Sequence, residues 1–419
     1  MILSNMKKII IIASLFLLST YYISGKEIAT IVVDAGASDR YETPVNISLD
    51  AITLEADSSL VLYEMINKEK VPVKYQIEQS QSGRILSWII SSHTKAKSKR
   101  RYIIENGKPE NFDNVINIKK SEDAILISSS ENKVMEYHYG VKLPPKGAKY
   151  EYRRSGFIHP LWSPTGEVLT NIQPRDHYHH YGIWNPWTRV TFEGKSVDFW
   201  NLADGQGTVR FKAFNSMTGG TVYGGLKGIQ EHVVFKPGYE KVAMNETFAI
   251  RLWDVKDEQN RKVWLWDFSS TMNCASESPF IINAYRYAGF SIRATPEWNT
   301  STSTILTSEG KTRKDADNTV ARWMFCNGKA GGNQSGILFL SYPTNFNFPE
   351  PIRVWPERDK DVYMNFNPAK TKDWPLMPGK DYTLQYRVVV YSGEMTAERA
   401  EQYWLDYASP PRITVTMTK

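Results

Sequence analysis

The chain has 419 residues, and its 51 Lys and Arg residues against 45 Asp and Glu residues give a formal net charge of +6 at pH 7. This excess is too small for a nucleic-acid-binding protein, which would carry a strong basic patch, so we expect no nucleic-acid partner. Two cysteines do not make a disulfide scaffold, and a large apolar core must therefore hold the fold together.

The first 25 residues have the pattern of a secretory signal peptide. Lys7 and Lys8 precede an apolar run over residues 9–18, and Gly25 is a small residue near a cleavage point. The pattern predicts export to the periplasm or the cell exterior. The alternative is an N-terminal membrane anchor, although residues 9–23 fall short of the roughly 20 apolar residues that span a bilayer. We expect no stable membrane span after processing.

Short runs of alternating apolar and polar residues occupy most of the remaining chain. Examples are TIVVDA, RILSWII, FAIRLWDV and TLQYRVVVYS, which are rich in β-branched and aromatic residues and are separated by turn residues. This pattern predicts an all-β protein. A polar composition shift between about residues 95 and 122 divides it into a small N-terminal β-sandwich, residues 26–108, and a large β-sandwich or supersandwich, residues 115–410. One late helix is expected from about Thr396, its N-cap, to Tyr407.

The segment QPRDHYHHYGIWNPW, residues 173–187, holds three of the seven histidines. Its two prolines and its glycine make a helix improbable, and in a loop the histidines can converge. Three interpretations stay open: a transition-metal site, general acid and base catalysis with an aspartate that orients one ring, and a loop held rigid by hydrogen bonds. The candidate catalytic residues are His159, Asp176, His177, His179 and His180.

Aromatic and polar residues near this segment predict a sugar subsite. Aromatic faces stack on sugar rings while polar groups hold the hydroxyls, and an arginine grips a carboxylate with two hydrogen bonds. For the tryptophans the alternative is a place in the core, and for Asp204 it is an ordinary turn. For Arg293, as for Arg286 and Arg353, which could also grip a carboxylate, the alternative is a surface ion pair. The candidate substrate-binding residues are Arg175, Trp184, Trp187, Asp204 and Arg293.

Several motifs of other enzyme classes are absent from the sequence. It has no G-x-G-x-x-G, Walker loop, G-x-S-x-G, H-E-x-x-H or C-x-x-C, which disfavours a nucleotide cofactor, a serine hydrolase and a zincin. No cofactor is firmly predicted, apart from a divalent metal that His177, His179 and His180 would hold in the metal interpretation. Cys274 and Cys326 are able to pair in an exported chain, and the sequence leaves that pairing open.

Two motifs carry a family resemblance. H-P-L-x-x-P-x-G from His159 to Gly166 and D-H-x-H-H-x-G from Asp176 to Gly182, followed by VDFWN and YRVVVYSG, resemble the exported PmoA-like family. This domain of unknown function is common in polysaccharide-degrading bacteria, and the resemblance covers about residues 130–410. It implies a β-sandwich module that works among glycan-degrading genes, in the periplasm or outside a Gram-negative bacterium. A weaker similarity links the strand-rich layout to galactose-mutarotase-like supersandwich proteins.

These observations lead to one expected function and two alternatives. We expect an exported carbohydrate-active enzyme of the glycoside hydrolase or lyase type, which acts on a glycan or oligosaccharide by hydrolysis or elimination. The histidine and aspartate cluster would carry the reaction. The alternatives are a non-catalytic glycan-binding protein and a metal-dependent enzyme that uses Zn or Cu.

Overall fold

The computed structural model describes residues 25–80, 83–356 and 360–418. The predicted signal peptide therefore lies, apart from its last residue, outside the described residues. Within these ranges no helix has both the length and the apolar character needed to cross a membrane.

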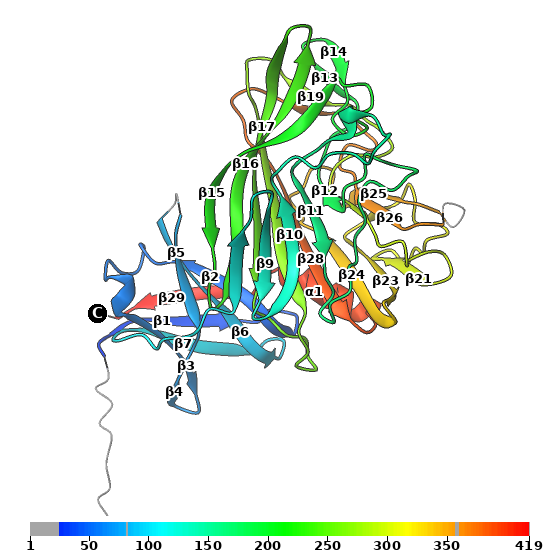
Figure 1. Cartoon of the computed structure of the whole chain (residues 1–419). Helices are drawn as coiled ribbons and strands as arrows, with labels where there is room; N and C mark the ends of the chain where they lie inside the picture. Colours follow the sequence, from blue (N-terminus) through cyan, green and yellow to red (C-terminus); the bar gives the residue numbers. More distant parts are fainter. Residues whose placement is uncertain (1–24, 81–82, 357–359, 419) are drawn as a thin grey trace, which may run out of the picture.

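The first described strands form two sheets that pack face to face at the base of the molecule (Figure 1). One sheet has the order β29-β1-β7-β3-β4 and the other β2-β6-β5. Their apolar faces share a core in which Trp88 and Tyr102 are fully buried and pack edge to face at 5.4 Å. The strands are β1 (Glu27–Asp34), β2 (Arg40–Ser48), β3 (Leu60–Ile66), β4 (Glu69–Pro72), β5 (Tyr75–Ser80), β6 (Gly83–Thr94), β7 (Lys99–Asn106) and β29 (Arg412–Met417).

Strand β29 comes from the opposite end of the chain. It pairs antiparallel with β1, from Ala29 opposite Met417 to Asp34 opposite Arg412. The sequence did not predict this strand. Its side chains are half-buried or exposed, so it lacks the buried apolar face that marks the inner strands.

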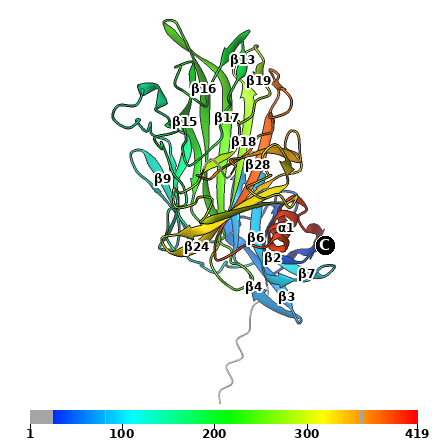
Figure 2. The ribbon, with the colours of Figure 1, turned by 90° about the vertical axis from the view of Figure 1, so that its right-hand side faces the viewer.

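A long antiparallel sheet forms the centre of the molecule (Figure 2). In the described part of the chain its order is β15-β16-β17-β18-β28-β24-β23-β21. Period-two alternation buries one face of these strands against a second sheet. The strands are β15 (Gly207–Thr218), β16 (Tyr223–Lys236), β17 (Tyr239–Trp253), β18 (Trp264–Cys274), β21 (Ser303–Thr307), β23 (Trp323–Ala330), β24 (Asn333–Ser341) and β28 (Tyr382–Ser392).

The second large sheet has the order β22-β25-β26-β20-β12-β11-β10-β9-β8 over the described residues. One apolar core joins it to the long sheet: Ile127 and Ile183 belong to the same buried cluster as Phe248, Trp266 and Val388. The strands are β8 (Ile116–Lys120), β9 (Ala124–Ser129), β10 (Asn132–His138), β11 (Phe157–Leu161), β12 (Ile183–Trp184), β20 (Ser291–Arg293), β22 (Val320–Ala321), β25 (Glu350–Val354) and β26 (Tyr363–Phe366).

Smaller elements complete the fold. A short sheet, β14-β13-β19-β27, adds buried residues to the main core, and short 3-10 turns lie at Asp57–Ser59 and Tyr150–Tyr152. Cys274 and Cys326 do not form a disulfide. The strands of the short sheet are β13 (Val190–Phe192), β14 (Lys195–Val197), β19 (Phe280–Ile282) and β27 (Trp374–Leu376).

The late helix α1 (Ala397–Ala408) packs on the outer face of the long sheet. Thr396 caps it, because its Oγ1 accepts a hydrogen bond from the Arg399 N–H at 3.2 Å. Ala400 and Tyr403 belong to a second buried cluster on that sheet, and Asp406 forms a buried ion pair with Arg40 at 2.9 Å. The predictions of an all-β fold and of one α-helix late in the chain are confirmed for the described residues.

Candidate functional site

The candidate site lies over one end of the second large sheet, where four neighbouring strands present their side chains. Strand β12 pairs with β20, β20 with β26, and β26 with β25. The histidine segment is the loop that leads into β12. Gly182 ends this loop with φ +60°, and a Cβ there would lie 2.2 Å from the carbonyl oxygen of Ile158. Only glycine allows the loop to pack this closely against β11.

Two consecutive turns give the histidine loop its shape. The N–H of His177 donates to the Pro174 carbonyl at 2.9 Å, and the N–H of His180 donates to the His177 carbonyl at 3.0 Å. The N–H of Gln173 closes the loop on the His180 carbonyl at 2.7 Å. This compact backbone brings the three imidazole rings to one side instead of alternating them as a strand would.

The three imidazoles converge. One ring nitrogen of each of His177, His179 and His180 lies within 4.8 Å of the other two. The ring centroids are 4.6 Å apart for His177 and His180 and 4.8 Å apart for His179 and His180. Nδ1 of His180 is buried and has no hydrogen-bond partner among the described residues. The cluster thus offers nitrogen lone pairs without internal partners.

Two of these rings are neutral at pH 7. Burial, followed by the charges of His177 and Arg154, lowers the pKa of His179 to about 3. Burial also lowers the pKa of His180 well below its ordinary value, with further contributions from His179, His177 and Arg293. Removal from water disfavours the imidazolium form, so both rings keep a lone pair that can bind an electrophile.

His177 is oriented by a chain of charged groups. Its Nδ1 lies 2.8 Å from Oδ2 of Asp176, and because a carboxylate only accepts, Nδ1 carries the proton and Nε2 is left free. Arg293 is fully buried and donates from Nη2 to Asp176 at 3.2 Å and also to Asp361. Burial raises the pKa of Asp176, but the His177 hydrogen bond and the Arg293 charge outweigh it, so the pKa is lowered overall.

The predicted role of Arg293 therefore changes. It does not line the cavity described below; it holds Asp176 and stacks against Trp355 at 4.7 Å. We assign it a positioning role instead of the expected contact with substrate.

A cavity of about 340 Å³ opens in front of the histidines. Asp176 and the three histidines form one side of it. Aromatic side chains from the neighbouring strands and loops form the other walls, and an amide and two arginines add polar groups. These further lining residues are Trp200, Asn201, Arg286, Tyr287, Arg353, Trp355 and Tyr363.

The structure places the other predicted residues away from this cavity. His159 is hydrogen-bonded through Nδ1 to Thr170 at 2.9 Å, and burial lowers its pKa to about 4. It does not line the cavity, so the structure does not bring this candidate catalytic residue together with the other three histidines. Arg175 and Asp204 are exposed and do not line the cavity either.

Both predicted sugar-binding tryptophans are buried. Trp184 lies behind His180, at 5.2 Å between ring centroids, in an aromatic cluster with Trp200 and Tyr363. Trp187 is fully buried in the main core and packs edge to face on Trp374. They are core residues, which was the alternative interpretation of their sequence context.

The candidate residues chosen from the sequence do not include the far wall of the cavity. Trp355, Arg353 and Arg286 come from segments more than 100 positions after the histidine loop. The available signal was an arginine close to aromatic residues: it lies between two tyrosines in YRY and two positions before a tryptophan in IRVWPER. Only the strand pairing of β20, β26 and β25 shows that these segments meet the histidines.

Comparison with known proteins gives a family and distant structural similarities. Residues 124–405, which are most of the chain, match the model of the Family of unknown function (DUF6807). No curated protein matches the chain. The PmoA-like resemblance and the galactose-mutarotase-like similarity stay predictions.

Among solved structures, the chain is similar to a protein of glycosyl hydrolase family 38 from Enterococcus faecalis, with 10% identity, 94% of this chain and 47% of that chain covered, and a TM-score of 0.48. For an alpha-mannosidase from Enterococcus faecalis V583 the identity is 10%, the coverage is 94% of this chain and 46% of that chain, and the TM-score is 0.46. For a GH36 alpha-galactosidase from Geobacillus stearothermophilus the identity is 11%, the coverage is 67% of this chain and 41% of that chain, and the TM-score is 0.31. The chain spans less than half the length of each of these. Such scores do not establish a common fold, so the proposal below rests on the site alone.

Proposed function

We propose that this chain, which belongs to DUF6807, a family of unknown function, is a carbohydrate-active enzyme whose three clustered histidines hold one divalent transition-metal ion. The observation that carries the proposal is the convergence of ring nitrogens of His177, His179 and His180 within 4.8 Å, at the wall of a cavity. We further propose, from the signal-peptide pattern, that it works in the periplasm or outside the cell.

The chemistry of the cluster favours a metal over acid and base catalysis. Neutral imidazole is the commonest ligand of zinc and copper, and three protein ligands with one open position are typical of catalytic zinc. Three nitrogens at about 2.1 Å from one ion would be roughly 3.4 Å apart, so the rings would close slightly on the ion. The Asp176 contact to His177 Nδ1 matches the carboxylate that orients metal-bound histidines.

The cavity walls support a sugar as the bound molecule. Half-buried Trp355 and Tyr287 offer aromatic faces, and Asn201 and two arginines offer hydrogen-bond partners. The volume of about 340 Å³ lies within the range of about 300–1,000 Å³ found for small-molecule sites. A metal in the open position would activate a water or polarise a sugar oxygen, which suits hydrolysis or elimination.

The test is turnover of a glycan panel by the mature chain, with new reducing ends as the sign of hydrolysis and unsaturated sugars as the sign of elimination. We expect activity to disappear with a chelator, to return with Zn²⁺ or Cu²⁺, and to be lost in His179→Ala. The matched control is His159→Ala, which changes a histidine outside the cavity and should retain activity. Turnover that survives both the chelator and His179→Ala would overturn the metal-dependent mechanism. Glycan binding without turnover would favour the non-catalytic alternative.

A further inference from the structure

A second cavity adjoins the candidate site, and one arginine belongs to both. The second cavity has a volume of about 670 Å³ and is lined by residues that include Tyr285, Asn318, Lys370 and Thr371. Arg286 lines this cavity and also the cavity in front of the histidines. A ligand that passes Arg286 would therefore occupy both spaces.

Arg286 is held in place without a charged partner. Its guanidinium lies over the rings of Tyr285 at 5.8 Å and Tyr287 at 5.4 Å. Tyr287 is itself anchored, because its hydroxyl donates to Asn201 at 3.0 Å. Among the described residues no carboxylate forms an ion pair with Arg286, so its charge is available to an anion from outside.

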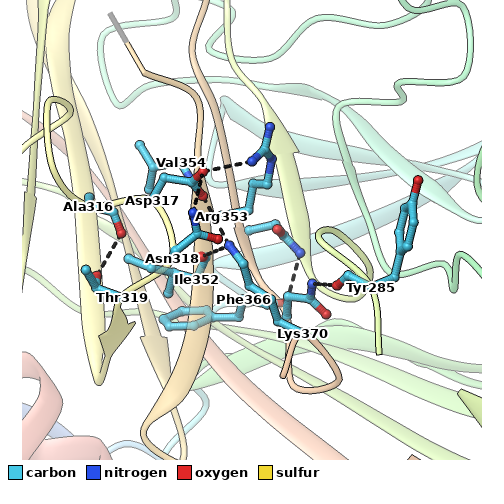
Figure 3. Close-up of polar contacts among 12 residues, drawn as sticks. Tyr285, Ala316, Asp317, Asn318, Thr319, Ile352, Arg353, Val354, Phe366 and Lys370 are labelled. Carbon is cyan, nitrogen blue, oxygen red and sulfur yellow. Dashed lines mark hydrogen bonds and ion pairs between the residues drawn. The ribbon is translucent and has the colours of Figure 1, made fainter. Parts of the chain in front are cut away.

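The surroundings of Arg286 carry an excess of positive charge. Asp317 accepts hydrogen bonds from Arg353 Nη1 at 2.8 Å and from Lys370 Nζ at 3.1 Å, and Figure 3 shows both contacts. One carboxylate thus faces two cations, and Arg286 adds a third. Arg189, whose guanidinium lies 4.7 Å from the ring of Tyr285, adds a fourth cation.

The negative charge of the site is gathered at its other end. There Asp176 and Asp361 share the single cation of Arg293. A divalent ion on the histidines would offset that excess. At the Arg286 end, Asp317 is the only carboxylate among the described residues that forms an ion pair with these cations. A bound anion is stabilised at such a junction by the local field and by the paired N–H groups of an arginine.

We propose that the two cavities are consecutive subsites for an anionic oligosaccharide, whose carboxylate or sulfate group binds Arg286 at the junction. This inference rests on the proposed function only in taking the ligand to be a glycan. It names the substrate class: an acidic chain that extends from the histidine end, past Arg286, toward Asn318 and Thr371.

The experiment uses calorimetry to measure how tightly the mature metal-loaded protein binds three oligosaccharides of equal length. They are a uronic-acid chain, a sulfated neutral-sugar chain and an unsubstituted neutral chain. We expect at least one anionic chain to bind about tenfold or more tightly than the neutral chain. Which of the two anionic chains binds more tightly shows whether the site prefers a carboxylate or a sulfate group. Arg286→Ala should remove that preference, so that the anionic and neutral chains bind this variant with affinities within about twofold of each other. The control Arg175→Ala removes an exposed arginine outside both cavities and should change nothing.

A second variant tests the second cavity. Asn318→Asp places a negative charge in its exposed lining, so it should weaken binding of the long anionic chain and leave the corresponding monosaccharide unaffected. Equal binding of anionic and neutral chains, or an anionic preference that survives Arg286→Ala, would overturn the inference. Zn²⁺ binding measured on the same samples separates the two proposals, because it depends on the histidines and not on Arg286.

Discussion

Asp176 makes two contacts that fix the histidine cluster, one to His177 Nδ1 and one to Arg293. We predict that Asp176→Asn lowers Zn²⁺ affinity about 10- to 100-fold, because an amide no longer enforces the His177 tautomer or pairs with the buried guanidinium. Calorimetric titration with Zn²⁺ measures this change. Asp204→Asn is the control, since Asp204 is exposed and outside the cavity. Equal affinities for the two variants would show that Asp176 does not position the cluster.

Substitution of Trp355 and of Trp187 should have different effects, one on glycan binding and the other on the stability of the fold. Trp355 is half-buried at the cavity wall, and Trp187 is fully buried in the core. Trp355→Ala should weaken glycan binding about tenfold and leave the protein folded. Trp187→Ala should lower the free energy of unfolding by about 3–5 kcal/mol. Chemical denaturation and glycan titration of both variants measure the difference, and a reversed pattern would contradict the assignment of the cavity wall.

Among single residues, the sequence indicated the histidines and Asp176 but not which aromatic residues line the cavity. A cluster of imidazoles is recognisable because few cores contain one, and its loop follows from proline and glycine. Trp184 and Trp187 lie in the same segment, but whether a tryptophan faces the core or a cavity depends on what covers it. Here the covering groups, Tyr363 and Trp374, lie more than 170 positions further along the chain.

Strand β25 carries a buried carboxyl group with a clear pH consequence. Glu350 is fully buried and accepts hydrogen bonds from Asn345 at 2.8 Å and Tyr386 at 2.9 Å. Burial raises its pKa from the ordinary 4.5 to about 7, despite these hydrogen bonds. The folded pKa exceeds the unfolded one, so its stability contribution is complete below pH 4.5 and is lost as the pH rises through 7.

Glu350→Gln isolates this contribution. Between pH 4 and pH 8 the wild type should lose stability relative to the variant by up to about 3 kcal/mol, since one pKa unit corresponds to about 1.4 kcal/mol. Denaturation curves of both proteins across this range measure the change, and the subtraction cancels groups such as Asp406 and His179 that also titrate. A difference that stays constant with pH would contradict a raised pKa for Glu350.

Among the elements, the inner strands and α1 were predictable and β29 was not. Alternation marks a strand with one buried face, and Thr396 followed by acidic and apolar residues marks a helix start. The side chains of β29 are exposed or half-buried, and its partner Glu27–Asp34 is almost the whole chain away. Local pattern therefore gave no reason to place it in the N-terminal sheet.

For the whole molecule, the first and the last described strands pair with each other. Strand β29 extends the sheet of β1, and the Arg40–Asp406 ion pair links α1 to the same region. We predict that removing residues 411–419 makes residues 26–106 sensitive to proteolysis, because the edge of β1 loses its ladder of hydrogen bonds. The Zn²⁺ affinity should equal that of the full-length chain, since the histidine loop leads into a strand of the second large sheet and not into the N-terminal sheets.

Limited proteolysis followed by mass spectrometry locates the first cuts. Met417→Ala is the control, because it shortens an exposed side chain and leaves the backbone pairing intact. If the truncated chain resists protease as the control does, β29 does not stabilise the N-terminal sheets.

The most direct test of the central claim is the metal stoichiometry of the purified mature chain after equilibration with Zn²⁺ and removal of free ion. Elemental analysis should find one ion per chain in the wild type and in His159→Ala. The ion should be lost from His177→Ala, His179→Ala and His180→Ala. Retention of the ion by all three of these variants, or no retained ion in the wild type, would contradict a metal centre built from the three histidines.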